Sequence, residues 1–142
     1  MFYCLRAGKL VVTGSVSQQM AICACRQVIQ EMQSIHKLSR LYYDQHLIQN
    51  IVCNVRVPAS CTLDVYQMYM EHNNLCTYQP KIFPGLIFRP QNSPIVLLVF
   101  KSSRIIVTGG RTYQDVINGF DQVRPILHKY FPYLNESHIE NF

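Results

Sequence analysis

The segment from Phe83 to Gly109 constrains the fold of this chain more than any other part of the sequence. It contains three short apolar stretches, Leu86–Arg89, Pro94–Phe100 and Arg104–Thr108. Turn-forming residues stand at Gly85, Pro90–Pro94 and Ser102–Ser103. Parallel strands need long crossover connections, and these connections are only a few residues long. The pattern therefore predicts three neighbouring antiparallel strands.

Both faces of the middle strand are apolar. Side chains alternate from one face of a strand to the other. One face therefore carries Val96, Leu98 and Phe100, and the other carries Ile95, Leu97 and Val99. An antiparallel sheet that is apolar on both faces needs a cover on each, from helices, a partner or a ligand.

Two long helices are predicted, one in the N-terminal half of the sequence and one in the C-terminal half. Ser17 can cap the first, whose apolar residues recur every three or four positions: Met20, Cys23, Ala24, Val28, Ile29, Met32 and Ile35. The second is expected over 112–130, with Val116, Ile117, Phe120, Val123 and Leu127 as its buried stripe. Pro125 is expected to kink this helix or end its regular part.

A strand and a short helix are predicted between these helices. In the strand Ile48–Val57, one face carries Ile51, Cys53, Val55 and Val57, and the other carries Asn50, Val52, Asn54 and Arg56. In the short helix, Thr62 is the expected cap, with Asp64 in the first turn. Its expected apolar residues are Leu63, Tyr66, Tyr69 and Met70.

The two ends of the chain carry a repeated sequence. The decapeptide LRAGKLVVTG, from Leu5 to Gly14, aligns without a gap with FKSSRIIVTG, from Phe100 to Gly109, at an offset of 95 residues (104 − 9). A complete repeat begins near His46, so its counterpart would begin about 50 residues before Met1. The sequence therefore predicts a shortened first repeat in residues 1–40, a complete second repeat in 46–131 and a tail in 132–142.

Composition narrows the classes of protein that fit. With 49% hydrophobic and 15% charged residues, the chain is built to bury a core. No apolar run reaches the roughly 18 residues of a membrane helix, so no membrane partner is expected. A net charge of +5 fits a polyanionic partner. None of the six cysteines forms a C-x2-C pair, so we expect small buried thiols in a reducing compartment, with no metal or cofactor.

The order of the motifs resembles the second repeat of the TATA-box-binding protein family. IQNIV, YQPKIFPGLIFR, PIVLLVF, RIIVTGGR and a helix with RPIL follow the same order over about Leu47–Phe131, and Leu5–Met32 resembles the end of the family's first repeat. The resemblance implies an α+β saddle: a curved antiparallel sheet with helices on the convex face and a pseudo-two-fold repeat, here with an incomplete first half. The concave face would be free for the minor groove of DNA.

The resemblance also implies roles for individual residues. Phe83 and Phe100 take the positions of a pair of phenylalanines that the family inserts between base steps. Base-edge contacts are implied for Asn50, Thr108 and Thr13, groove contacts for Val52, Val96, Leu98, Ile106 and Val11, and phosphate contacts for Arg89, Arg104, Arg111 and Lys9. A phenylalanine taken alone is more often a core residue, and an arginine taken alone a solvated one, so these roles depend on the whole pattern.

The sequence departs from the family at two surfaces. The family contacts general transcription factor IIB through acidic residues that flank a proline, and here Gln79 and Lys81 stand in those positions. A reversed charge at Lys81 opposes that contact. The helix after Ser17 also lacks most of the basic residues that the family uses for factor IIA. Factors IIA and IIB are therefore expected as weakened partners. Leu5 replaces a phenylalanine of the first repeat's inserted pair.

Three hypotheses follow for the function. The first is a nuclear DNA-binding transcription initiation factor of the TATA-box-binding type. The second is an interaction module that has lost DNA binding and pairs with a second copy or another chain through the incomplete half. The third is an enzyme, which is disfavoured because no carboxylate pair, Cys–His pair or Ser–His–Asp set converges on the motif-bearing strands.

Overall fold

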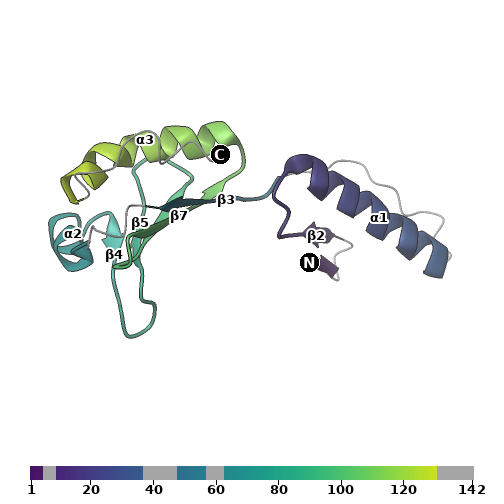
Figure 1. The fold of residues 1–142 in the computed structure, drawn as a ribbon, viewed down its shortest axis with the longest axis horizontal. Helices are drawn as coiled ribbons and strands as arrows, with labels where there is room; N and C mark the ends of the chain where they lie inside the picture. The colour runs from purple at the N-terminus through teal and green to yellow at the C-terminus, as the bar shows by residue number, and fades with distance from the viewer. Residues whose placement is uncertain (5–8, 37–47, 57–62, 131–142) are drawn as a thin grey trace. The chain divides into compact units, whose positions relative to one another are not determined.

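The computed structural model describes residues 1–4, 9–36, 48–56 and 63–130. The chain divides into two compact units, Met1–Leu47 and Ile48–Phe142 (Figure 1). The predicted repeat boundary between residues 40 and 46 and the predicted tail both lie outside the described residues. The division into repeats at those positions stays a prediction.

The first unit is a β-hairpin and a long helix. Strand β1 (Phe2–Cys4) pairs antiparallel with β2 (Leu10–Val12), and helix α1 spans Gln18–His36. The Ser17 hydroxyl accepts the N–H of Met20 at 3.2 Å, so the predicted cap is confirmed. No described side chain in this unit is buried, and two members of the predicted apolar stripe, Met20 and Ile35, are 54% and 72% exposed.

The second unit contains one five-stranded antiparallel sheet. Its strands are β3 (Ile51–Arg56), β4 (Cys76–Thr77), β5 (Leu86–Phe88), β6 (Val96–Val99) and β7 (Arg104–Gly110), in the order β3-β7-β6-β5-β4. The three strands predicted between residues 86 and 108 are confirmed, and they are neighbours in the sheet. The alternation predicted for β3 also holds, because Cys53 and Val55 are buried while Val52 and Asn54 are exposed.

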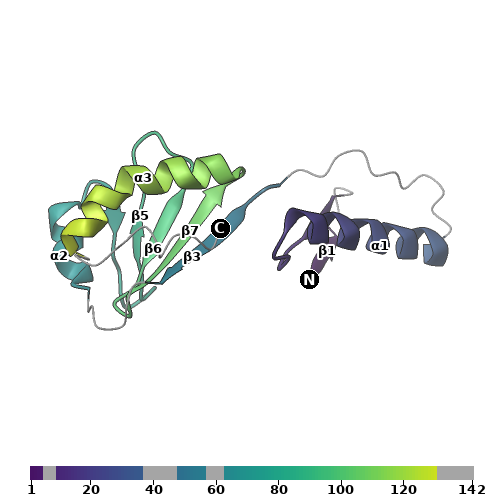
Figure 2. The same cartoon turned by 45° about the horizontal axis from the view of Figure 1, so that its top comes forward.

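Two helices, α2 (Val65–Glu71) and α3 (Tyr113–Tyr130), complete this unit. Helix α3 lies across one face of the sheet (Figures 1 and 2). Reciprocal hydrogen bonds cap its first turn. The Thr112 hydroxyl accepts the Asp115 N–H at 3.0 Å, and the Asp115 carboxylate accepts the N–H groups of Thr112 and Arg111. These bonds favour the ionised carboxylate and lower the pKa of Asp115. Among the described helices, none is both long and apolar enough to cross a bilayer.

The start of α2 corrects the sequence prediction. Asp64 is the N-cap, and its carboxylate accepts the N–H groups of Tyr66 and Gln67, both at 3.0 Å. The expected cap, Thr62, lies outside the described residues. Leu63 precedes the helix, so a stripe counted from it is out of phase. Val65 and Met68 are buried, while the expected Tyr66 and Met70 are 60% and 55% exposed.

The burial predicted for Ile117 in α3 was also wrong. Ile117 is 44% exposed, because the helix approaches the sheet closely at Gly119 on another side. A Cβ at Gly119 would lie 2.5 Å from the side chain of Ile95. Of the two effects expected of Pro125, an end to the helix is wrong, because the helix continues to Tyr130, while a kink stays a prediction. The carbonyl that Pro125 leaves without a partner would belong to Asp121, an exposed residue, so water can satisfy it.

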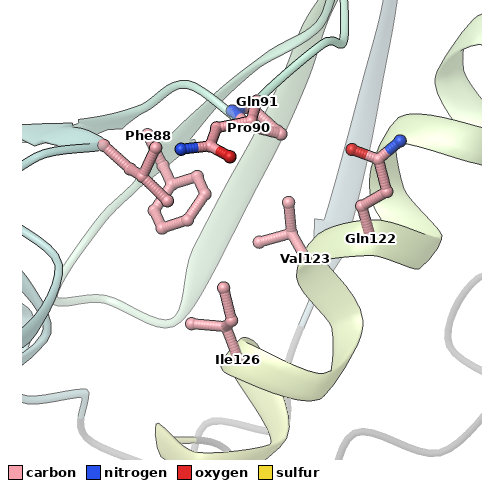
Figure 3. A pocket seen from close by; sticks show the side chains of 7 residues that line it. Phe88, Pro90, Gln91, Gln122, Val123 and Ile126 are labelled. Atoms are coloured by element: carbon pink, nitrogen blue, oxygen red, sulfur yellow. The ribbon is translucent and has the colours of Figure 1, made fainter.

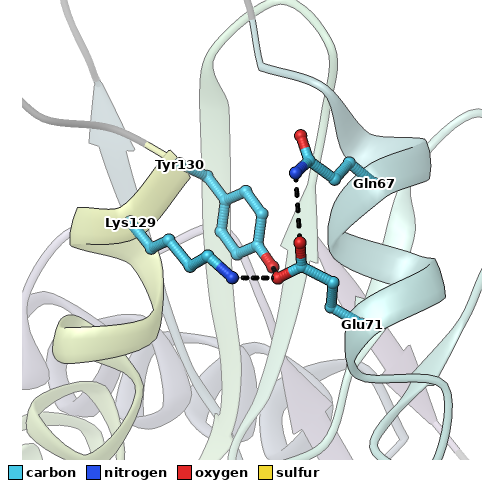
Figure 4. Close-up of polar contacts among 4 residues, drawn as sticks. All are labelled: Gln67, Glu71, Lys129 and Tyr130. Carbon is cyan, nitrogen blue, oxygen red and sulfur yellow. Dashed lines mark hydrogen bonds and ion pairs between the residues drawn. The ribbon is translucent and has the colours of Figure 1, made fainter.

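A polar cluster joins the ends of α2 and α3 (Figure 4). One carboxylate oxygen of Glu71 accepts hydrogen bonds from the Lys129 ammonium and the Tyr130 hydroxyl, and the other accepts the Gln67 amide at 3.0 Å. The hydrogen bond from Lys129 is the main cause that lowers the pKa of Glu71 to about 2. Burial, and then the Glu71 carboxylate, raise the pKa of Tyr130.

Replacement Glu71→Gln is expected to remove a pH-dependent part of the stability. The folded pKa, about 2, lies below the ordinary value of 4.5, so this contribution is complete above pH 4.5 and is lost as the pH falls through 2. Thermal unfolding followed by circular dichroism should separate wild type and variant more at pH 7 than at pH 2. An equal separation at both pH values would contradict this assignment.

The buried face of α3 predicts unequal effects of two truncations on stability. Leu127 is fully buried, so Leu127→Ala should lower the free energy of unfolding by about 2–5 kcal/mol. Ile117→Ala removes a half-exposed side chain from the same helix and should cost less than about 1 kcal/mol. Urea unfolding of both variants measures the difference. Similar losses would mean that α3 packs with a different face.

Candidate nucleic-acid interface

Along each strand, buried side chains alternate with side chains on the opposite face of the sheet. The side chains on that opposite face form cross-strand rows. One row crosses all five strands and consists of Asn54, Ile106, Leu98, Ile87 and Thr77, each opposite the next. In a second row, Val96 lies opposite Thr108. We call this surface, with Val52 and Phe100, the open face.

The open face is apolar but only partly covered. Val96, Leu98 and Ile106 are half-buried, and Val52 is 57% exposed. Their neighbours on the opposite face belong to the buried core, to which α3 also contributes: Ile95, Leu97, Val99, Ile105 and Val107. The two apolar faces predicted from the sequence are therefore used differently, one for the core and one as a surface.

Phe83 and Phe100 form an aromatic pair in the second unit. Their ring centroids are 5.7 Å apart with an interplanar angle of 66°, and both side chains are half-buried. Phe100 continues the alternation of β6, while Phe83 lies in the β4–β5 connection, where its N–H donates to the Gln79 carbonyl. Gly85 makes room for the pair, since a Cβ there would lie 2.7 Å from the Phe83 ring and 3.0 Å from the Phe100 ring.

Two residues with predicted base contacts are brought together in the structure. The Asn50 amide nitrogen lies 2.9 Å from the Thr108 hydroxyl, although the two residues are 58 positions apart in sequence. Asn50 is exposed and Thr108 half-buried. Asn50 and Thr108 therefore lie together, with Thr108 opposite Val96 in the second row.

Exposed cations accompany the open face. Arg89 directly follows β5 and Arg104 begins β7, and both keep the alternation of the open-face residues in their strands. Arg111 is exposed just beyond the end of β7. The expected partner-contact residues Gln79 and Lys81 are exposed in the β4–β5 connection, next to Ile82, which is 82% exposed.

Three predicted site residues belong to the first unit. Lys9, Val11 and Thr13 alternate along β2 and its flanks, and all three are exposed. These three residues are of the same types as the open-face residues of β7: a cation, a branched apolar residue and a hydroxyl.

Sequence reasoning missed the parts played by Ile87 and Gly85. Ile87 lies on the open face opposite Leu98, and its signal was present, because it alternates with the buried Leu86 and Phe88. Gly85 was expected only as a turn residue. Its role beneath the aromatic pair depends on contacts between segments distant in sequence, for which a single chain gives no local signal.

A cavity of about 180 Å³ lies between α3 and the segment around β5 (Figure 3). Its lining consists of Leu75, Phe88, Pro90, Gln91, Gln122, Val123 and Ile126. None of these side chains can serve as a general acid, base or nucleophile. This cavity is therefore not a candidate for a catalytic centre.

The prediction that the cysteines are buried thiols is only partly confirmed. Cys53 and Cys76 are buried, and burial raises the pKa of Cys76 to about 12. Cys25 is half-buried, and Cys23 is exposed, contrary to the prediction of a buried thiol. Among the described residues, no three His, Cys, Asp or Glu side chains are grouped so that they could hold a metal ion.

Comparison with known proteins matches these features to one family. The family model described as transcription factor TFIID (or TATA-binding protein, TBP) matches residues 45–130. The TATA-box-binding protein of Acanthamoeba castellanii is 33% identical over 126 residues, which cover 87% of this chain and 46% of that protein. The Acetabularia peniculus protein is 34% identical, with 85% and 61% covered, and human TATA box-binding protein-like 2 is 32% identical, with 85% and 34% covered. The chain thus spans between about a third and three fifths of these relatives.

A solved structure shows the same fold. Methanococcus jannaschii TBP aligns with a TM-score of 0.72 at 22% identity, covering 91% of this chain and 74% of that one. The predicted fold class, an α+β fold with a helix-covered antiparallel sheet, is confirmed. Because the family model matches more than half of the sequence and the fold agrees, the chain belongs to the TATA-binding protein family.

Proposed function

We propose that this chain is a transcription initiation factor of the TATA-box-binding type, whose open face binds and bends the minor groove of DNA. The single observation that carries the proposal is the open face itself, an apolar surface left half-exposed by the fold and accompanied by a half-exposed aromatic pair. The family to which the chain belongs and the names of its relatives support it.

The chemistry of the open face suits a widened minor groove. That groove presents sugar edges and hydrogen-bond acceptors and few donors, so a flat surface of Val52, Val96, Leu98 and Ile106 can lie against it with little loss of hydrogen bonding. Donors are needed only at a few positions, and Asn50 and Thr108 supply them. Ile87 joins this contact surface by its place opposite Leu98.

The aromatic pair would supply the bend. Minor-groove proteins that kink DNA insert apolar side chains between base steps and recover the cost of unstacking through a larger contact area. Phe83 and Phe100 have the partial exposure that such a wedge needs. Arg89, Arg104 and Arg111 would contact phosphates, in keeping with the net charge of +5.

This function implies a nuclear protein that works with general transcription factors. Lys81 and Gln79 are exposed and offer no negative charge to factor IIB, so the proposal includes a weakened contact at this connection. The same argument applies to factor IIA at α1, where few basic residues remain.

One observation favours a second candidate function. No described residue of the first unit is buried, and the apolar stripe of α1 is half-buried or exposed. A module that associates with another chain through this unit, and no longer binds DNA, fits that exposure. DNA affinity decides between the two candidates, since the second predicts a stable association without it.

The aromatic wedge predicts that Phe83→Ala/Phe100→Ala abolishes bending. We expect at least about tenfold weaker binding to a TATA-containing duplex, because the kink is lost with the inserted rings. Gel-shift titration and a bending assay measure both. Tyr66→Ala/Met70→Ala truncates two exposed apolar side chains on α2 and is the matched control, which should bind and bend like wild type. Normal bending by the Phe variant would remove the wedge from the proposal.

The phosphate contacts predict a change in salt dependence. Each phosphate contact adds about 0.9 to the slope of log affinity against log salt, so Arg89→Gln/Arg104→Gln should reduce that slope by about 1.8. Lys129→Gln, on α3, removes one positive charge away from the open face and should leave the slope unchanged. A slope that both changes alter alike would indicate a general charge effect.

A further inference from the structure

The segment that joins α2 to α3 carries positive charge and no negative charge. Residues 72–112 contain five lysines and arginines and no aspartate or glutamate. Three of the five are the arginines that the proposed function already uses, and the other two are Lys81 and Lys101. Both lysines are exposed, and neither ammonium has an ion pair or a hydrogen bond with a described residue. Neither charge therefore stabilises the described part of the fold through a direct contact.

Lys81 lies in a turn that is fastened to Phe83. The Gln79 carbonyl accepts the N–H groups of both Ile82 and Phe83, each at 2.9 Å. In Figure 1 the connection from β4 to β5 extends beyond the sheet on the side away from α3. The Cα atom of Lys81, two residues before Phe83, lies at most about 7 Å from the Phe83 Cα. The hydrogen bond from Phe83 therefore holds this lysine close to the first ring of the aromatic pair.

Lys101 lies in a second turn, which is fastened to Phe100. The Phe100 carbonyl accepts the Ser103 N–H at 3.0 Å, and the Phe100 N–H donates to the Arg104 carbonyl at 2.9 Å. Phe100 is thus the first residue of the tight turn between β6 and β7, and Lys101 is the next. Consecutive Cα atoms are about 3.8 Å apart, so the Lys101 side chain begins directly beside the second ring's backbone.

The two turns anchor both lysines near one point of the candidate interface, because the rings of Phe83 and Phe100 are only 5.7 Å apart. We propose that Lys81 and Lys101 form a phosphate-binding site around the aromatic pair, in which their ammonium groups contact the backbone phosphates that flank the base step into which the rings insert. This inference rests on the proposed DNA-binding function.

A phosphodiester is the anion that suits this arrangement. Duplex DNA carries one negative charge per about 1.7 Å of its axis, so phosphates lie on both sides of any base step that a wedge separates. Lysine offers a compact charge on a flexible stem, which can contact a phosphate without reading the base sequence. The two contacts would add affinity at the step where unstacking costs free energy. An acidic protein segment is the other class of partner that two unpaired lysines could bind, and it is an outcome of the test.

The first repeat also has a cation in the position that corresponds to Lys101. At the offset of 95 residues, Arg6 aligns with Lys101 and Leu5 aligns with Phe100. Arg6 lies outside the described residues, so this observation is one of sequence alone. A basic residue directly after the position of the ring therefore occurs in both halves of the sequence.

The first experiment measures the number of phosphate contacts. In the intact chain, Lys81→Gln/Lys101→Gln should reduce the slope of log affinity against log salt by about 1.8, because each contact adds about 0.9. Between about 50 and 200 mM salt, wild type should then lose about twelvefold more affinity for a TATA-containing duplex than the variant. The matched control, Arg26→Gln/Lys129→Gln, removes two exposed charges from α1 and α3 and should keep the wild-type slope. An unchanged slope in the lysine variant would overturn the inference.

The second experiment locates the contacts on the DNA. The two phosphates of each base step in turn are replaced by neutral methylphosphonates, and 2-aminopurine fluorescence identifies the step that wild type unstacks. Neutral phosphates at that step should weaken binding by wild type at least about tenfold, and binding by Lys81→Gln/Lys101→Gln less than about twofold. Equal losses for the two proteins would show that the lysines act only as general charge, which also contradicts the inference.

The outcomes separate this inference from the proposed function. If wild type binds and bends the duplex while the lysine variant keeps the wild-type slope, only the inference fails, and an acidic protein segment becomes the partner to test. A folded wild-type chain that binds no duplex at low salt would overturn both. The bend gives a further distinction: Lys81→Gln/Lys101→Gln should bend the bound duplex like wild type, because both rings remain, whereas Phe83→Ala/Phe100→Ala should lose the bend and keep most of the salt dependence.

Discussion

The packing of α3 against one face of the β6–β7 pair is the interaction on which the second unit depends. Leu97 and Val107 are fully buried on the sheet, and Phe120 and Leu127 are buried on the helix. Burial of such side chains contributes about 1.5–3 kcal/mol each. Because side chains alternate strictly along a strand, fixing one face against α3 also fixes which residues are left on the other. The open face is thus a consequence of the core.

That dependence also determines the outline of the candidate interface. The cross-strand row from Asn54 to Thr77 inherits its spacing from the ladder of the sheet, so its apolar side chains need no separate support. The residues that need an individual position are few. Gly85 makes room for the aromatic pair. Gly109 lies close to the Pro94 carbonyl, and its N–H donates to the Asn50 Oδ1. A side chain at either glycine would obstruct these approaches.

Much of this could be predicted from the sequence. The strands around Leu98, and the grouping of Val96 with Leu98 on one face, followed from strict alternation, a local property that a sequence displays directly. That this face would stay open was implied by the family resemblance. The burial of Ile117 and the cap at Thr62 were predicted wrongly, because helix phase depends on where the neighbouring element approaches. Neither the register shift between Ile51 and Cys53 in the β3–β7 pairing nor the contacts of Gly85 has a local signal. Both arise from pairing between segments that are distant along the chain.

The aligned helices show how far amphipathic pattern alone determines burial. Four buried residues of α3, Val116, Phe120, Val123 and Leu127, align at the same offset with Ala21, Cys25, Val28 and Met32 of α1. All four α1 residues are only half-buried. The α3 residues pack on a five-stranded sheet, whereas the first unit offers α1 the two strands β1 and β2. The periodic pattern specifies which face of a helix can be buried. The area of the sheet that faces the helix determines how much of that face is buried.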